Sequence, residues 1–320
     1  MSGTLAVVPL GALAAMLAIL VAEAVPAIRY NGWRFFTSSA WNPGNAYAPV
    51  VRAPVPHPPG ARYGAWPLIA GTLESSAIAL AVALPVALGA AILVVEKLPR
   101  RAGAAIGWCL ETLAGVPSAV IGLWGVLVFG PFLAAHVYPA LQHVPDVPVL
   151  GVLRGSFNPA GQGLLTGGLV LAAMIVPIIA ATTRDLLRQV PVAAKEGAVA
   201  LGMTDAEAFR AVQARWIRTG VIGAAALGLG RALGETIAIA LVSGSSFGLA
   251  TSLYGSMTTI AATIVTQLDS AQADPSGLAV RTLAEAALVL FAITLAVNVA
   301  ARLLTRRAGR GLALPVGAVA

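Results

Sequence analysis

The sequence has very little charge. Only 10% of its 320 residues are Asp, Glu, Lys or Arg, whereas soluble globular proteins carry roughly 25%. Hydrophobic residues make up 58% of the chain, and the mean hydropathy is +0.86. So few charged side chains exclude an ordinary water-soluble domain. The composition predicts a polytopic membrane protein, and its long apolar runs favour an all-α fold.

Several chemical signatures are also missing. The single cysteine, Cys109, excludes an intrachain disulfide. No GxxxxGK[ST] sequence is present, so the chain is not expected to hydrolyse ATP itself. An intramembrane enzyme is disfavoured because HExxH is absent and no Asp lies in a predicted span. His136 and His143 lack a third ligand, so we expect no metal site.

The apolar runs are long enough to cross a bilayer, which needs about 20 residues of helix. The first run has no basic leader and no clear cleavage site, so we interpret it as a retained span. A Ser- and Thr-rich stretch at 244–268 is weaker and is predicted to be re-entrant or half-buried. The predicted spans cover residues 5–26, 66–95, 104–134, 163–182, 219–242 and 282–304.

Basic residues predict the orientation of these spans. The net charge of +7 is attributed to topology and not to nucleic-acid binding. With the N-terminus inside, the inner segments hold more Lys and Arg than the outer ones, so both termini are predicted to be cytoplasmic. The outer segment 29–65 is rich in aromatics and then in Pro, as expected for an interfacial, extended connector. Pro85, Pro117 and Pro177 lie inside spans and favour a transport pathway.

The largest inner segment, 182–218, has the pattern of two short helices. Residues 192–201 form a helical stretch that Gly202 is placed to end, at the position after the C-cap. Thr204 then resembles an N-cap, with Glu207 three residues later completing a capping box. The segment is either an ordinary loop or a docking element for a cytoplasmic partner.

Two charges lie inside the span 219–242, in the stretch LGLGRALGETIAIALV. Arg231 and Glu235 are four residues apart, which places them one above the other on a continuous helix. A charge at the bilayer centre costs about 2.5–3.5 kcal/mol, so both are expected to face protein or water. They are either a buried ion pair that fixes packing or part of a functional site. Beside them runs a predicted close-packing face of Ala226, Gly230, Gly234 and Ala238.

The inner segment resembles the permease subunits of bacterial ABC importers. Their inner-loop motif reads Glu-Ala-Ala, three residues, Gly, nine residues, then Ile-x-Leu-Pro. The chain departs from this motif at Gly197, which replaces Ala, and at Arg215, which replaces Pro. The resemblance implies a coupling helix that fits a groove in an ATPase subunit. The residues assigned to coupling are Glu196, Gly197, Ala198 and Gly202.

Longer blocks narrow the resemblance to permeases of the phosphate-specific importer, PstC type, over about residues 30–304. The companion PstA-type permease shares part of GRALGET, but IAIALVSG and the WNP sequence favour the PstC type. The blocks are FFTSSAWNP (35–43), GAWPLIAGTLESSAIAL (64–80), ETLAGVPSAVIGLWG (111–125), MIVPIIAATTRDLL (174–187) and LGRALGETIAIALVSG (229–244).

This resemblance implies a type I importer permease fold with about six transmembrane helices in the bacterial cytoplasmic membrane. The implied organisation is a first helix at 1–28, an outer loop at 29–65, a permease domain at 66–306 containing the coupling loop, and a tail at 307–320. The implied partners are a second permease in a heterodimer, two ATPase subunits and an outer-face phosphate-binding protein. ATP and magnesium would belong to the ATPases, and this chain would bind no cofactor.

The resemblance also implies a substrate pathway. A guanidinium offers paired donors that match phosphate oxygens, so Arg231 is predicted to line the path and Glu235 to make the contact transient. Glu111, six residues before Pro117, either caps a broken helix or faces the same path. Open alternatives are a permease for molybdate, sulfate or phosphonate, the PstA-type subunit, and a nutrient sensor that no longer transports.

Overall fold

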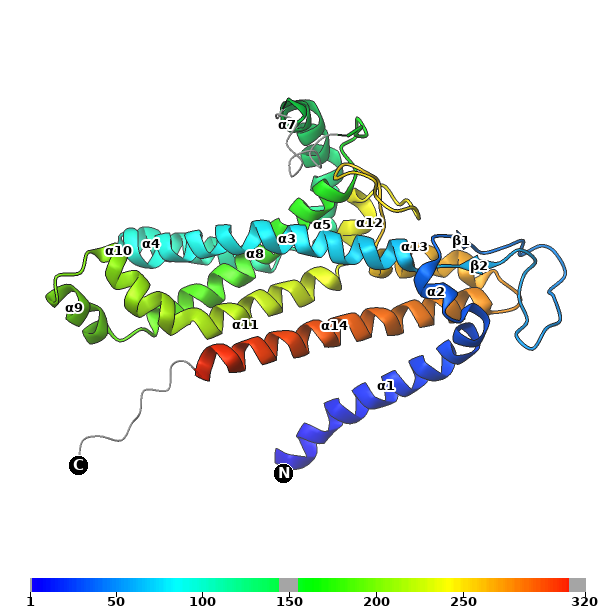
Figure 1. The fold of residues 1–320 in the computed structure, drawn as a ribbon, viewed down its shortest axis with the longest axis horizontal. Coiled ribbons are helices and arrows are strands. Elements are labelled where there is room, and N and C mark those ends of the chain that lie inside the picture. Colours follow the sequence, from blue (N-terminus) through cyan, green and yellow to red (C-terminus); the bar gives the residue numbers. More distant parts are fainter. Residues whose placement is uncertain (1, 144–154, 311–320) are drawn as a thin grey trace. The chain divides into compact units, whose positions relative to one another are not determined.

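The computed structural model describes residues 2–143 and 155–310 and is mostly helical (Figure 1). Its described residues form two compact units. The first contains residues from 1–75, 122–167 and 234–293, and the second contains residues from 76–121, 168–233 and 294–320. The helices α3 (Trp66–Ile92), α5 (Ser118–Trp124), α8 (Leu164–Arg188) and α14 (Leu278–Arg310) contribute residues to both units.

The first unit combines long helices with a two-stranded sheet. Strands β1 (Trp41–Asn42) and β2 (Arg62–Tyr63) are antiparallel, with Trp41 opposite Tyr63. The other elements of this unit are α1 (Ser2–Asn31), α2 (Arg34–Thr37), η2 (Gly125–Phe129), α6 (Gly130–Phe132), η3 (Leu133–Val137), α7 (Tyr138–Gln142), α12 (Ile237–Val242) and α13 (Ile260–Gln272).

An apolar cluster holds the first unit together. Phe35 from α2, Leu68 from α3 and Ile260 from α13 are buried in it. The start of α14 contributes Leu278 and Leu283 to the same cluster. Burying a large aliphatic or aromatic side chain stabilises a fold by about 1.5–3 kcal/mol, so this cluster fixes the ends of α3, α13 and α14 against α2.

The Ser- and Thr-rich stretch predicted to be re-entrant contains an irregular segment, 243–259, followed by the short helix α13. Several of its backbone groups are paired: the Met257 amide donates to the Ser243 carbonyl (2.9 Å), and the Leu164 amide donates to the Gly255 carbonyl (3.0 Å). Thr259 caps α13 by accepting the Ala262 amide at 3.2 Å. Irregular backbone is tolerated at membrane depth only where it is satisfied in this way or lines a wet cavity.

The second unit contains the elements around the predicted coupling segment. Leu187 of α8 and Ile217 of α11 are buried against Ala91 of α3. Within this unit α4 packs against η1, where Gly103 lies close to the Val94 carbonyl. Besides parts of the long helices, its elements are η1 (Leu93–Lys97), α4 (Arg100–Ala114), α9 (Val192–Ala200), α10 (Asp205–Ala208), η5 (Phe209–Gln213) and α11 (Ala214–Leu233).

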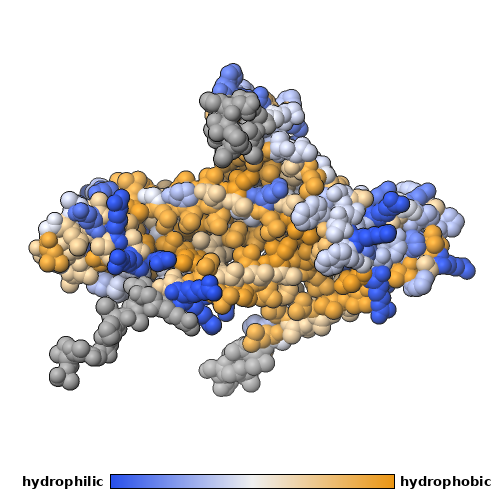
Figure 2. Space-filling view, viewed as in Figure 1, coloured by the Kyte–Doolittle hydropathy of each residue, from blue (hydrophilic) through white to orange (hydrophobic). Residues whose placement is uncertain are grey.

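By length and composition, five described helices are able to cross a membrane, which agrees with a multi-pass protein. Apolar residues cover most of the helical surface visible in Figure 2. The candidate spans are Val8–Asn31, Trp66–Lys97, Ser118–Gln142, Leu164–Arg188 and Leu278–Ala308.

Two predicted spans are divided in the structure. The helix predicted over 104–134 is broken at 115–117, because Pro117 has no amide to continue α4, and α5 begins at Ser118. The helix predicted over 219–242 ends at Leu233 and resumes as α12 at Ile237. The outer helices are longer than predicted. α1 continues to Asn31, and α14 continues to Arg310, so the predicted tail is reduced to 311–320, which lies outside the described residues.

Candidate functional site

The predicted coupling segment forms the two-helix pattern expected from its sequence. Helix α9 ends at Ala200, and Gly202 has a φ of +84°. The Gly202 amide donates to the Val199 carbonyl (2.9 Å), and the Met203 amide donates to the Ala198 carbonyl (3.3 Å). This pair of bonds is a Schellman motif, which satisfies the last carbonyls of α9. The prediction that Gly202 ends this helix is confirmed.

The second helix begins with the predicted capping box. The Thr204 hydroxyl accepts the Glu207 amide (3.4 Å), and the Thr204 amide donates to Glu207 Oε2 (2.8 Å). These bonds from the Thr204 backbone and side chain lower the pKa of Glu207. Beyond this cap, α10, η5 and α11 follow one another directly. Arg215, at the position of the motif's Pro, permits this continuity because it has an amide to donate.

The α9–α10 segment presents an apolar surface to solvent. Leu201 is 82% exposed, and Val192 and Val199 are also exposed. Glu196 and Gly197 share this exposure, whereas Ala198 is buried. Next to Leu201 is an open depression of about 530 Å³ whose polar lining includes Glu207, Arg210 and Arg215. We name this surface, from Val192 to Arg215, the α9–α10 surface.

An ion pair ties α9 to the rest of the second unit. Lys195, in the middle of α9, pairs with Glu96 of η1. Both residues are partly shielded from solvent, which weakens screening of the pair. The π-helical turn of η1 follows directly on α3 and carries Glu96 to this position. The pair therefore fixes the position of α9 relative to η1.

We expect opposite effects from two alanine substitutions in this segment. At Gly197 an added Cβ meets nothing within 4 Å, so Gly197→Ala should favour α9 by up to about 1 kcal/mol. At Gly202 the positive φ makes Gly202→Ala unfavourable by about 1–2 kcal/mol. Thermal unfolding of the assembled transporter should show a higher midpoint for the first variant and a lower one for the second. A shift of both in the same direction contradicts this account.

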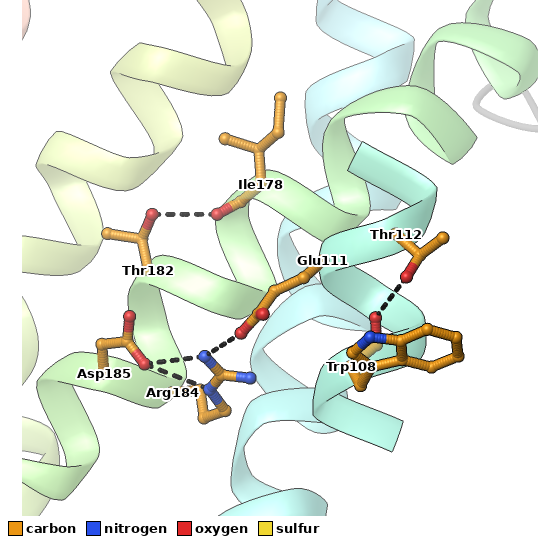
Figure 3. Close-up of polar contacts among 7 residues, drawn as sticks. All are labelled: Trp108, Glu111, Thr112, Ile178, Thr182, Arg184 and Asp185. Atoms are coloured by element: carbon orange, nitrogen blue, oxygen red, sulfur yellow. Dashed lines mark hydrogen bonds and ion pairs between the residues drawn. The ribbon is translucent and has the colours of Figure 1, made fainter. Parts of the chain in front are cut away.

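A second charged group lies within the second unit and was not predicted as a site. Arg184 of α8 donates through Nη2 to Glu111 Oε1 (2.7 Å) and to Asp185 Oδ1 (3.0 Å), as Figure 3 shows. Its side chain is only 8% exposed. Gly107, one turn before Glu111, leaves room for the guanidinium, because a Cβ there would lie 2.5 Å from Nη1. Glu111 thus joins α4 to α8.

Sequence reasoning missed Arg184 because the span was predicted to end at residue 182. The helix α8 instead continues to Arg188, so Arg184 and Asp185 belong to it and not to a loop. The available signal was the Gly107–Glu111 spacing, which places a small residue and a carboxylate on one helix face. Nothing in the spacing identified Arg184 as the partner.

The predicted relationship between Arg231 and Glu235 is wrong. Helix α11 ends at Leu233, so the two residues are not stacked on one helix. Arg231 is exposed in the last turn of α11, whereas Glu235 is buried before α12, and its Oε1 accepts the Ala238 amide at 3.3 Å. Among the described residues neither forms an ion pair. Each charge instead lies at a helix end that favours its sign, a cation at a C-terminus and an anion at an N-terminus.

The small-residue face of α11 is also displaced from its predicted position. Gly230 has open space around it, so it does not mediate close packing. The buried small residues are Ala224, Gly228 and Ala232, which also recur every four positions. A Cβ on Gly228 would lie 2.9 Å from Ile179 Cδ1, so this face brings α11 close to α8.

Comparison with known proteins places this geometry in a family. Residues 83–310 match the family described as "Binding-protein-dependent transport system inner membrane component". The chain belongs to this family. It is therefore a multi-pass inner-membrane component of an ABC importer and a permease subunit, and its relatives are not ATPases. The family works with further transporter subunits and a substrate-binding protein.

Individual relatives of this permease are similar over nearly their whole length. The chain is 57% identical to "Phosphate transport system permease protein PstC 1" of Mycobacterium tuberculosis, covering 99% of this chain and 94% of the relative. It is 39% identical to "Phosphate transport system permease protein PstC" of Pasteurella multocida, covering 90% and 87%. The prediction of a PstC-type resemblance is confirmed.

Solved structures support the permease fold. An inward-facing MetNI methionine ABC transporter chain aligns with a TM-score of 0.50 at 16% identity, covering 76% of this chain and 96% of that chain. A chain of a bacterial ABC transporter involved in alginate import also aligns with a TM-score of 0.50, at 15% identity. The alignment covers 75% of this chain and 78% of that chain. At these identities the likeness concerns the fold alone, and the predicted type I importer permease fold is confirmed.

Proposed function

We propose that the chain is a permease subunit of an ATP-driven importer that moves inorganic phosphate across the cytoplasmic membrane by alternating access. The observation that carries this proposal is the near full-length similarity to relatives named as phosphate transport permeases. The permease fold supplies the transmembrane part of such a machine, and partner subunits supply the energy.

The proposed assembly contains a second permease, two cytoplasmic ATPase subunits and an outer-face phosphate-binding protein. The ATPases bind ATP and magnesium, and this chain binds no cofactor. One ATPase docks on the α9–α10 surface, where exposed Leu201 and Val199 offer apolar contact next to Glu196 and Gly197. In this arrangement both termini and the α9–α10 surface lie on the cytoplasmic side, as the distribution of basic residues favours.

We assign the unwound segment 234–236, which precedes α12, to the substrate pathway. Unwound backbone in an apolar segment is tolerated where it is buried in protein or lines a wet cavity, and transporters place substrate sites at such breaks. Arg231 offers its guanidinium to phosphate from the last turn of α11. Glu235 holds the start of α12 and limits how tightly the anion is retained. We also assign Glu111 to this pathway, and its carboxylate accepts a hydrogen bond from Arg184.

Competition between oxyanions tests the substrate. Arsenate has the same shape and protonation states as phosphate, so it should reduce uptake of labelled phosphate when added at equal concentration. Sulfate has no proton to donate, and a site that hydrogen-bonds a substrate hydroxyl rejects such an analogue by roughly 10⁴–10⁵-fold. Uptake by cells that carry the complete transporter should therefore be unchanged by excess sulfate. Inhibition by sulfate, molybdate or phosphonate, with none by arsenate, would assign another substrate.

A further inference from the structure

A pocket of about 460 Å³ lies in the first unit, and no residue of the segment 234–236 lines it. It is bounded by the end of α1, by α2 and by β2. The side chains that matter here are Tyr30, Asn31, Arg34, Ser38, Arg62 and Tyr63. No Asp or Glu is among the residues that line it.

The pocket has a strong positive charge. Arg34 and Arg62 enter it from two different elements, and neither guanidinium forms an ion pair with any described residue. The carboxylate of Glu285 accepts a hydrogen bond from the Asn31 side chain at 2.7 Å and is buried beyond the lining. The two guanidinium groups are therefore available to an anion from solvent.

Uncharged donors complete the lining. Tyr63 is only 5% exposed, and its hydroxyl has no hydrogen-bond partner among the described residues. Burial, reinforced by Asp274, raises the pKa of Tyr63, so the hydroxyl stays protonated and able to donate. The Ser38 hydroxyl accepts the Ala40 amide at 3.1 Å, and its own proton is available. A buried, unpartnered hydroxyl is unfavourable by about 1–3 kcal/mol, which a bound acceptor would relieve.

The pocket lies where two candidate spans end. The span in α1 ends at Asn31, and the span that begins α3 starts at Trp66. Trp33 is 78% exposed, and Phe36 and Trp66 are exposed as well. Exposed aromatic side chains at span ends are typical of the headgroup region of a bilayer. The pocket therefore opens at the level of lipid phosphates.

We propose that this pocket binds a phosphate group, with Arg34 and Arg62 contacting its oxygens and with Tyr63 and Ser38 donating hydroxyl bonds. Guanidinium groups bind phosphate oxygens through paired, charge-assisted hydrogen bonds. The phosphate group belongs to the headgroup of an anionic phospholipid or to free inorganic phosphate outside the membrane. The two sources present the same oxygens and differ in whether acyl chains accompany them.

Native mass spectrometry of the assembled transporter in phosphatidylglycerol nanodiscs tests this site. The wild type should retain phosphatidylglycerol, and the Arg34→Gln/Arg62→Gln variant should retain at least about tenfold less. Arg52→Gln is the matched control, because Arg52 is an exposed arginine of the same outer loop that does not line the pocket. Tyr63→Phe should also reduce retention, and it removes no hydrogen bond to a described residue.

Competition with inorganic phosphate separates the two sources. Retention of phosphatidylglycerol that is unaffected by added phosphate assigns the site to lipid. The site is assigned to free phosphate if radiolabelled phosphate binds the wild type and Arg52→Gln. In that case it should bind neither the double variant nor a transporter loaded with phosphatidylglycerol. Equal lipid retention and equal phosphate binding by all variants would overturn the proposal. Loss of binding-protein attachment alone in the double variant would also overturn it, since the arginines would then contact a protein.

Discussion

Arg231→Gln should reduce phosphate uptake by about a hundredfold or more while the transporter still assembles. Hydrogen bonds to a charged group contribute about 1.5–3 kcal/mol each, and losing one or two of them from the transport barrier gives this reduction. Arg231 is exposed, so the substitution leaves no cavity and no unpaired buried carboxylate. Uptake of labelled phosphate by cells, with co-purification of the partner subunits, measures both effects.

The matched control is Arg218→Gln. Arg218 is an exposed arginine of the same helix, α11, and lies thirteen positions before Arg231 in the inner segment. Arg218→Gln removes the same charge from the same helix as Arg231→Gln, so a general effect of lost positive charge would reduce uptake equally in both variants. Normal uptake by Arg231→Gln, or equal loss in both variants, would refute a pathway role for Arg231.

Leu201→Asp should abolish attachment of the ATPase subunit. Leu201 is the most exposed apolar residue of the α9–α10 surface, and an apolar contact there would have to desolvate the new carboxylate. The substitution follows the end of α9 and breaks no internal packing, so the isolated permease should remain folded. Co-purification of the ATPase with the permease should fall by at least about tenfold, and ATP-driven uptake should fall with it.

Leu201→Met is the conservative control, since it keeps an apolar side chain of similar volume at the same position. It should retain both attachment and uptake. Thr204→Ser, which preserves the capping hydroxyl next to this position, should behave in the same way. Full ATPase attachment in Leu201→Asp would show that the partner docks elsewhere on the chain.

The coupling segment was predictable because its signals are local. Gly202, Thr204 and Glu207 lie within a few residues of one another. Gly is typical of the position after a helix C-cap, and Thr followed three residues later by Glu is typical of a helix N-terminus. The apolar helices were predictable for a similar reason, since a bilayer requires long runs of apolar residues. Five of them are present as candidate spans, although their ends differ by several residues.

The break at 234–236 was not predictable from such signals. The apolar pattern continues through it, and Gly234 and Thr236 are common within membrane helices. Glu235 stabilises the new start of α12 by accepting an amide, which only the folded backbone reveals. Arg184 was missed for a different reason. Its partner Glu111 is 73 residues away, and no spacing rule connects positions so distant in the chain.

Two of the ion pairs described in the second unit connect its helices in series. Lys195 joins α9 to Glu96 of η1, η1 packs on α4, and Glu111 of α4 joins Arg184 of α8. A bound partner that displaces α9 would therefore also displace α4 and α8 through these ion pairs. The displacement would not have to be transmitted along the backbone of α10 and η5. A force on α9 therefore has a side-chain route to α8, which is the most buried of the described candidate spans.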